Sequence, residues 1–271
     1  MEVGDEAVAA RSTTPGSVHG MEGGDRVDWA NRSEDRGAFQ AAAVISEEEG
    51  PVATGRKPEL TDAERARVEA AVHAAEQHTS AEIVPMVVGR SGLYREAHHR
   101  AGLLSAVLAL TALLTIETAW LPWGWQASNA VWLLGGTMLA YSVGVWLGTW
   151  PAILRLFTSH ERMRHKVRMR AERAFVQQGL AHTRERTGLL LMVSLLERQV
   201  YILPDHALQA RISVDQWQEI VAGVVERLKA GDLAGGLCHG IEASGVLLAR
   251  VVPSRDGDNP NELPNAVIQD L

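Results

Sequence analysis

Apolar residues are concentrated in one stretch of the chain, from Ala101 to Trp150. Residues 101–116 carry no formal charge and, extended by residues 97–100, are long enough to cross a bilayer core. Residues 127–150 are also uncharged and exceed the about 20 residues that a spanning helix requires. The pattern predicts a hairpin of two transmembrane helices. The alternative is a pair of buried helices in a large soluble core.

The link between the two predicted spans, residues 120–125, contains three tryptophans, a proline and a glycine. Indole rings favour the membrane–water interface and proline stops helices, so we expect this turn at a headgroup surface. Glu117 is the one acid near the tip of the hairpin. We expect it to cap the first span in interfacial water. The alternative, a proton or ion relay, would need polar partners at mid-bilayer.

Basic residues on the two flanks predict the orientation of the hairpin. The connecting turn has neither Lys nor Arg, whereas bases precede the first span and follow the second: Arg90, Arg95, Arg100, Arg155, Arg162, Arg164, Lys166, Arg168, Arg170 and Arg173. By the positive-inside rule, both flanks and both termini are expected on the cytoplasmic side of a bacterial inner membrane. The larger cluster lacks interleaved aromatic residues, which favours anionic lipid over nucleic acid as its partner.

Composition divides the rest of the chain into two tails and one domain. Residues 1–58 hold eleven acids against six bases and only scattered apolar residues, which predicts a disordered acidic tail. Residues 59–96 and 154–253 are expected to form two parts of one domain, interrupted by the hairpin at residues 97–153. Residues 254–271 form a C-terminal tail, loose or docked on the domain.

Within these parts, apolar residues at three-and-four spacing predict four helices. Three begin with Ser or Thr followed three residues later by Glu or Gln, at Thr61, Thr158 and Ser213, and a Gly- and Ala-rich helix runs from Asp232 or Leu233 to Val252. On the first helix, Glu69 and Glu76 are expected mostly toward water. The inner stripe of the second is expected to be Met163, Val167, Ala171, Ala174 and Phe175.

Short apolar runs at residues 81–89, 189–195 and 200–203 predict three strands, the last two antiparallel. These runs are apolar on both faces, as expected of strands covered by helices on each side. Pro85 donates no ladder hydrogen bond, which favours a place beside an edge or at a bulge for the first strand. The expected fold class is therefore α/β, with a small mixed sheet flanked by helices. The single cysteine, Cys238, excludes an intramolecular disulfide and agrees with a reducing compartment.

Three runs of the sequence resemble the TPM domain. They are Thr79–Val84, Thr187–Arg198, and Ala230–Leu233 with Gly236-Leu237. The family is named for members in a thylakoid phosphatase, a photosystem II repair protein and a receptor modulator. The similarity covers about residues 60–253, and the chain resembles the bacterial membrane subgroup in which two spans follow the first strand. The resemblance implies a TPM-like fold and a phosphatase activity that some members show weakly.

The resemblance also implies a divalent cation, Ca or Mg, because some relatives bind one through acids near the strand ends. The matching acids are Glu82, Glu197 and Asp205, and together with Arg198 they form a candidate ligand or cation rim at one end of the sheet. Thr187 stands where many relatives have Asn or Asp, a departure that weakens a metal site. The alternative is a solvated rim of turn residues.

The chain shows no phosphate-binding loop, no Cys followed by Arg at phosphatase spacing and no HExxH pair. The leading hypothesis is therefore a membrane-anchored TPM-domain protein that acts as a cytoplasmic-face binding or assembly module. Its expected partners are the lipid bilayer and a membrane protein, with no nucleic acid. The rival is a divalent-cation-dependent phosphatase that uses Glu82 and the turn acids. A transporter or channel is third, because two spans offer few internal polar residues.

Overall fold

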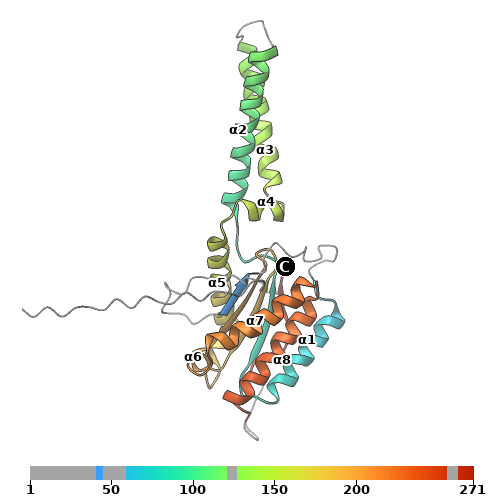
Figure 1. Cartoon of the computed structure of the whole chain (residues 1–271), viewed down its shortest axis with the longest axis vertical. Coiled ribbons are helices and arrows are strands. Elements are labelled where there is room, and N and C mark those ends of the chain that lie inside the picture. The colour runs from blue at the N-terminus through green and yellow to red at the C-terminus, as the bar shows by residue number, and fades with distance from the viewer. Residues whose placement is uncertain (1–40, 45–58, 121–126, 255–261) are drawn as a thin grey trace, which may run out of the picture.

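The structure is a computed structural model that describes residues 41–44, 59–120, 127–254 and 262–271. A domain built on one sheet carries a stalk of two helices, which occupy the positions of the two predicted spans (Figure 1). The Trp-rich turn at residues 121–126 and most of the predicted acidic tail lie outside the described residues, as does the side chain of Glu117.

The sheet is mixed, and its strand order is β1-β4-β3-β2-β5. Strand β2 runs parallel to β3 and β5, whereas β4 runs antiparallel to β3 and β1. The predicted α/β fold class is thus confirmed. The strands are β1 (Ala41–Val44), β2 (Ile83–Val88), β3 (Leu189–Ser194), β4 (Gln199–Pro204) and β5 (Ile268–Asp270).

Four long helices pack on the sheet and two form the stalk. Those on the sheet are α1 (Asp62–Glu76), α5 (His160–Gln177), α7 (Val214–Lys229) and α8 (Leu233–Val251). The stalk consists of α2 (Arg95–Trp120) and α3 (Ala127–Leu147). Shorter helical pieces lie in the connections, namely α4 (Pro151–Leu156), η1 (Leu180–His182) and α6 (His206–Gln209).

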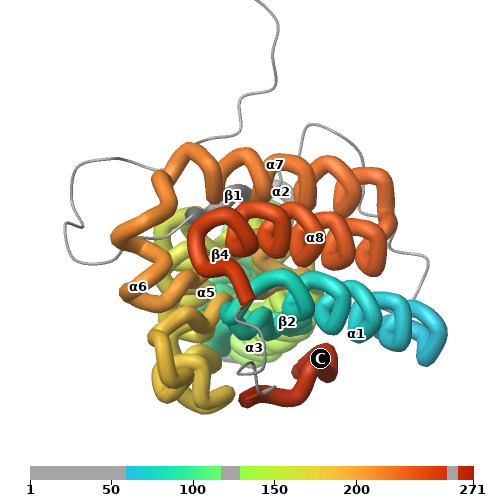
Figure 2. Tube along the Cα trace, turned by 90° about the horizontal axis from the view of Figure 1, so that it is seen from below, coloured from blue at the N-terminus to red at the C-terminus, as the bar shows by residue number. Residues whose placement is uncertain are grey.

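Helices cover both faces of the sheet, as the doubly apolar strands predict. Helices α1, α8 and α7 lie side by side over one face (Figure 2). Helix α5 packs on the opposite face. Successive residues of β2 alternate between the two, since Ile83 and Val87 face the three-helix layer while Val84 and Met86 face α5. All five residues of the predicted inner stripe of α5 are buried.

Capping explains two of the three predicted helix starts. The hydroxyl of Thr61 accepts from the N–H of Glu64 at 3.3 Å while the Glu64 carboxylate accepts from the N–H of Thr61 at 2.9 Å. Ser213 and its Gln216 form the same box on α7. The start predicted at Thr158 is wrong, because α5 begins at His160 with Ser159 as its cap. An unpredicted helix, α4, uses the residues just before, and Thr158 lies in the turn between the two helices.

The two outer strands come from segments that the sequence analysis treated as tails. Strand β1 lies within residues 1–58, and its four residues depart from the expected disorder because their apolar run pairs along β4. Strand β5 docks the C-terminal tail onto β2. This pairing begins at Met86, one residue after Pro85. Strand β2 thus lies beside the edge strand β5, as Pro85 predicts. Pro85 itself is not paired with β5, which suits a residue that has no N–H to donate.

Small residues bring the two stalk helices together. The hydroxyl of Ser105 donates to the carbonyl of Ala140 across the pair at 2.7 Å. A methyl group added at Gly144 would lie 2.8 Å from the carbonyl oxygen of Ala101 and would also overlap Ser105. A glycine at this place permits the backbone approach that apolar helix pairs use in membranes.

We expect Gly144→Ala to force α2 and α3 apart and to lower the free energy of unfolding by about 1–3 kcal/mol, as overpacking does elsewhere. Gly135→Ala is the matched control on the same helix, because no atom lies within 4 Å of the added methyl group. Equilibrium unfolding of the detergent-solubilised chain measures both. Equal stabilities of the two variants would contradict the close approach at Gly144.

Candidate functional site

The four candidate rim residues lie at opposite ends of the sheet. Glu82 precedes β2 and Asp205 follows β4, which places both at the end away from the stalk, here called the distal end. Glu197 and Arg198 form the turn between β3 and β4 at the end next to the stalk, here called the neck. The prediction of one converging rim is wrong. Because β4 is antiparallel to β2 and β3, the start of β2 is level with the end of β4, and the β3–β4 turn lies about 17–20 Å away.

At the neck, Glu197 ties the sheet to the segment that enters the stalk. Its side chain is buried, and Oε1 accepts from the N–H of Ser91 at 2.8 Å and from the hydroxyl of Tyr94 at 2.5 Å. The hydroxyl of Ser194 donates to Oε2. Burial and the Glu197 carboxylate raise the pKa of Tyr94, so the phenol stays a donor. Arg198 is half-buried and adopts a positive φ of 50°, as a tight turn requires.

A small apolar cluster surrounds this junction. Tyr94 and Ala97 meet Leu154 of α4 and Met163 of α5, and all four side chains are buried. The cluster joins the foot of α2 to the two helices that follow the stalk. The neck is therefore a packed junction in which Glu197 supplies the buried acceptor.

We expect Glu197→Gln to lower the free energy of unfolding by about 1–3 kcal/mol, because the amide nitrogen cannot accept the hydrogen bonds that a carboxylate oxygen accepts. Arg198→Gln is the neighbouring control, with a half-buried side chain and no role in the neck hydrogen bonds. Thermal unfolding of both variants in one detergent provides the comparison. If both variants lost the same stability, the hydrogen bonds of Glu197 would make no specific contribution to the stability of the neck.

At the distal end, two buried carboxylates come together. Glu76 ends α1 and accepts from the N–H of Ile83 at 2.9 Å, whereas Oε1 of Glu82 accepts from the N–H of Glu262 at 3.2 Å. The other oxygen of Glu82 has no hydrogen-bond partner among the residues that the structure describes. Burial and the Glu82 carboxylate raise the pKa of Glu76 to about 7, against the opposing hydrogen bonds from Ile83 and Asn265. Burial also raises the pKa of Glu82.

Sequence analysis missed Glu76, which it expected in water. The signal was present, since Glu76 follows Val72 by four residues on the stripe that Val68 and Val72 bury. Asp205, by contrast, caps the short helix α6 through the N–H of His206 at 2.6 Å. Strand β3 separates it from Glu82 by two strand spacings, about 10 Å.

The distal acids provide oxygen ligands of the kind that Ca and Mg take. Among the described residues, no group of three or more His, Cys, Asp or Glu side chains is arranged to hold a metal ion. Thr187, at the position where the resemblance would place an acid or amide, is buried and donates its hydroxyl to the carbonyl of Ser80 at 3.1 Å. Its role here is to fasten the loop before β3 to the residues before β2.

The raised pKa of Glu76 predicts a pH-dependent stability. The folded chain keeps this proton up to about pH 7, whereas the unfolded chain releases it near the ordinary value of 4.5. The free energy of unfolding therefore falls as the pH rises through this window. Glu76→Gln keeps the acceptor for Ile83 and removes the titration. We expect it to be more stable than the wild type by about 1–3 kcal/mol at pH 8 and similar to it below pH 4.5.

Thermal unfolding of the full chain between pH 4 and pH 9 measures this difference. The half-exposed Glu69 of α1 offers a control, Glu69→Gln, for which we expect a curve parallel to that of the wild type. A constant gap between Glu76→Gln and the wild type across the whole pH range would rule out a buried proton at Glu76.

Comparisons with known proteins find one family model and one solved structure that are similar to this chain. Residues 155–246 match the family model described as the TPM domain, from the end of α4 into α8. The NMR structure of BA42 protein from the psychrophilic bacterium Bizionia argentinensis is similar at 19% identity and a TM-score of 0.49, covering 79% of this chain and 98% of that chain. No curated protein matches the chain.

Proposed function

Since this chain carries a TPM domain at residues 155–246, we propose that it is a membrane-anchored TPM-domain protein of the bacterial inner membrane. In this proposal the stalk crosses the bilayer twice and the domain lies on the cytoplasmic face. The domain acts there as a binding or assembly module for a protein of the same membrane.

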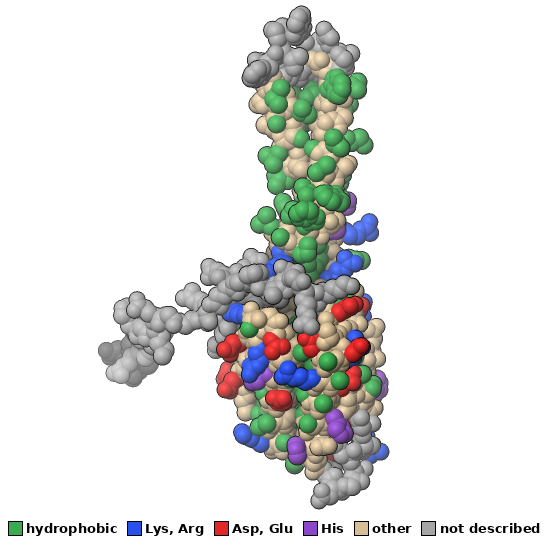
Figure 3. Space-filling model, turned by 90° about the vertical axis from the view of Figure 1, so that its right-hand side faces the viewer, with side chains coloured by type: hydrophobic (Ala, Val, Ile, Leu, Met, Phe, Trp, Pro, Cys, Tyr) green, Lys and Arg blue, Asp and Glu red, His purple; other side chains and the backbone are tan. Residues whose placement is uncertain are grey.

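The observation that carries the proposal is the surface of the stalk. Both helices are long and apolar enough to cross a membrane, and only 17% and 6% of their most apolar windows are buried. Large side chains such as Trp132, 80% exposed, and Met138, 75% exposed, point away from the helix pair. Hydrophobic side chains cover the stalk in Figure 3, whereas charged ones gather over the domain. A soluble core would bury such helices, so the pattern favours lipid as their surroundings.

The charges at the foot of the stalk support the orientation. Arg95, Arg100 and Arg162 all lie at the neck, next to the domain. Basic residues beside a span are retained on the cytoplasmic side. They therefore support a cytoplasmic position for the domain and for both termini.

The hydrogen bonds of Glu197 and of Thr187 favour a structural role over a catalytic one for these two residues. Both carboxylate oxygens of Glu197 already accept hydrogen bonds from the protein, and Thr187 is fixed to the loop before β2. These groups hold the fold together and are not presented to a substrate. In this proposal the domain instead binds a partner that resides in the same membrane.

Membrane insertion is tested by alkaline carbonate extraction, with reporter fusions at each terminus. We expect the full chain to stay in the membrane pellet. At each terminus, a reporter that works only in the cytoplasm should be active, and a reporter that works only outside the cytoplasm should be inactive. A variant in which a short linker replaces residues 97–153 is the control, and it should be extracted. Extraction of the full chain, or an external terminus, would reject the proposal.

The assembly role is tested by crosslinking in native membranes followed by affinity purification. The full chain is compared with a hairpin-only chain of the same tag and expression level. We expect at least one membrane protein to be recovered only with the full chain. Identical partners for the two would show that the domain recruits nothing.

The distal acids favour a second candidate, a divalent-cation-dependent phosphatase. Glu82 is 5% exposed and keeps one oxygen without a hydrogen-bond partner among the described residues, next to the carboxylate of Glu76. Such a pair becomes ionised when a cation binds, because the cation offsets the mutual repulsion. A bound cation would then activate water and neutralise phosphate charge.

This alternative is tested with an aryl phosphate and the detergent-solubilised full chain, with and without Ca or Mg. A phosphatase requires metal-dependent turnover that Glu82→Gln abolishes and that the control Glu69→Gln retains. Turnover independent of metal, or unaffected by Glu82→Gln, would remove the distal acids from catalysis.

A further inference from the structure

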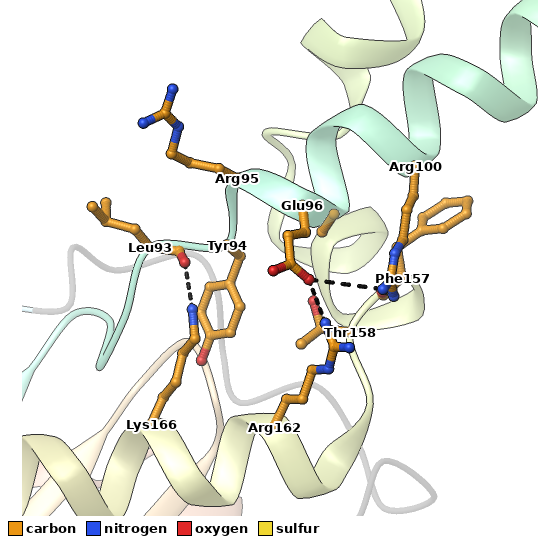
Figure 4. A pocket seen from close by; sticks show the side chains of 10 residues that line it. Leu93, Tyr94, Arg95, Glu96, Arg100, Phe157, Thr158, Arg162 and Lys166 are labelled. Carbon is orange, nitrogen blue, oxygen red and sulfur yellow. Dashed lines mark hydrogen bonds and ion pairs between the residues drawn. The ribbon is translucent and has the colours of Figure 1, made fainter.

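A pocket of about 320 Å³ opens at the neck, between the foot of the stalk and the domain. It is formed by the start of α2, the turn after α4 and the first turns of α5 (Figure 4). It lies just below Ala101, where the uncharged part of α2 begins. If the uncharged parts of α2 and α3 span the hydrocarbon core, the pocket lies at the depth of the lipid headgroups.

The lining of this pocket is strongly cationic. Its lining residues include four bases, Arg95, Arg100, Arg162 and Lys166, and one acid, Glu96. Glu96 is shared, since it forms an ion pair with Arg162 and lies 3.7 Å from the guanidinium of Arg100. In Figure 4 the side chain of Arg95 extends away from Glu96. The pocket therefore keeps an excess of positive charge after its internal pairs are made.

A buried hydroxyl adds a neutral polar group to the same lining. Thr158 is 9% exposed, and its Oγ1 has no hydrogen-bond partner among the described residues. Figure 4 shows Thr158 beneath Glu96, between α2 and α5. A buried hydroxyl without a partner is costly. An oxyanion held by the neighbouring guanidinium groups would accept from it.

Apolar side chains flank the pocket. Leu93 lines it and is 66% exposed, and Leu156, immediately before the lining residue Phe157, is 80% exposed. Trp150 at the start of α4 is exposed as well, a position that suits an indole at a membrane interface. A ligand that joins an anionic group to long apolar chains matches both parts of this surface.

We propose that the neck pocket binds the phosphodiester group of an anionic phospholipid, with the acyl chains lying along the foot of the stalk. Arg162 and Arg100, held in place by Glu96, contact the phosphate oxygens, and Thr158 donates its hydroxyl to one of them. Arg95 and Lys166 add attraction for the negative charge. This inference rests on the proposed membrane insertion and adds a specific lipid site to it.

Native mass spectrometry of the full chain in a neutral detergent tests the site, with added phosphatidylglycerol and with phosphatidylcholine of the same acyl chains. We expect phosphatidylglycerol to bind at least tenfold more tightly. Arg162→Gln should weaken it about fivefold, the factor that one basic residue near a lipid surface contributes. Arg173→Gln, an exposed arginine of the same helix outside the pocket, should leave binding unchanged.

Thr158→Val separates a built site from general attraction, because it removes the hydroxyl and keeps size and charge. We expect it to weaken phosphatidylglycerol binding several-fold without lowering the Tm, because the hydroxyl that it removes is buried without a partner among the described residues. The site would be overturned if Arg162→Gln and Thr158→Val both bound phosphatidylglycerol as tightly as the wild type. It would also be overturned if Arg173→Gln lost as much binding as these two variants.

Glycerol 3-phosphate provides the free-phosphate arm of the test. We expect it to leave bound lipid in place at tenfold excess, because it lacks the acyl chains. Displacement at equal concentration would overturn the lipid assignment in favour of a soluble phosphate ester. Carbonate extraction tests membrane insertion separately. If the chain stays in the membrane but the pocket variants bind lipid as the wild type does, the lipid site is contradicted and the proposed membrane insertion is not.

Discussion

The apolar surface of the stalk is the constraint on which the rest of the arrangement depends. Helices α2 and α3 bury little of themselves against each other, because small residues such as Gly144 bring their backbones close and leave the large side chains outside. Water is a poor environment for that surface. The charged and packed groups consequently begin where the apolar helices end, at Arg100 on one side and after Trp150 on the other.

The two ends of the sheet use buried carboxylates in different ways. Glu197 at the neck is saturated with donors, which fixes the strand turn to the foot of the stalk. Burial raises the pKa of both Glu76 and Glu82 at the distal end, and the nearby Glu82 carboxylate adds to the effect on Glu76. The same type of side chain serves as a structural acceptor at one end and as a titratable pair at the other. The surroundings, not the residue type, decide between these roles.

Local patterns predicted the parts of this fold that local interactions determine. The inner face of α5, the capping boxes at Thr61 and Ser213, and the antiparallel pair β3–β4 all follow from spacing within a few residues. The pairings of β1 and β5 could not be predicted in this way, because short apolar runs become strands only when an edge is available to pair with. Helix α4 was missed since its six residues merge with the apolar run before it.

The prediction of the candidate site was wrong for the same reason, because it depended on long-range pairing that local sequence patterns do not contain. Each of Glu82, Glu197 and Asp205 was correctly placed at a strand end, but which end of the sheet it occupies depends on strand direction. Glu76 was assigned to water because carboxylates are rarely buried, and the donors from Ile83 and Asn265 come from segments that the helix pattern does not include.

Strands β2 and β3 are parallel neighbours in the middle of the sheet, yet roughly 100 residues of chain separate Val88 from Leu189. Joining two such distant segments would ordinarily carry a large entropic penalty and slow the folding reaction. Here the helical hairpin returns the chain almost to its starting point, since Gly148 packs against His98. Assembly of the hairpin thus shortens the effective loop that the pairing of β2 with β3 has to close.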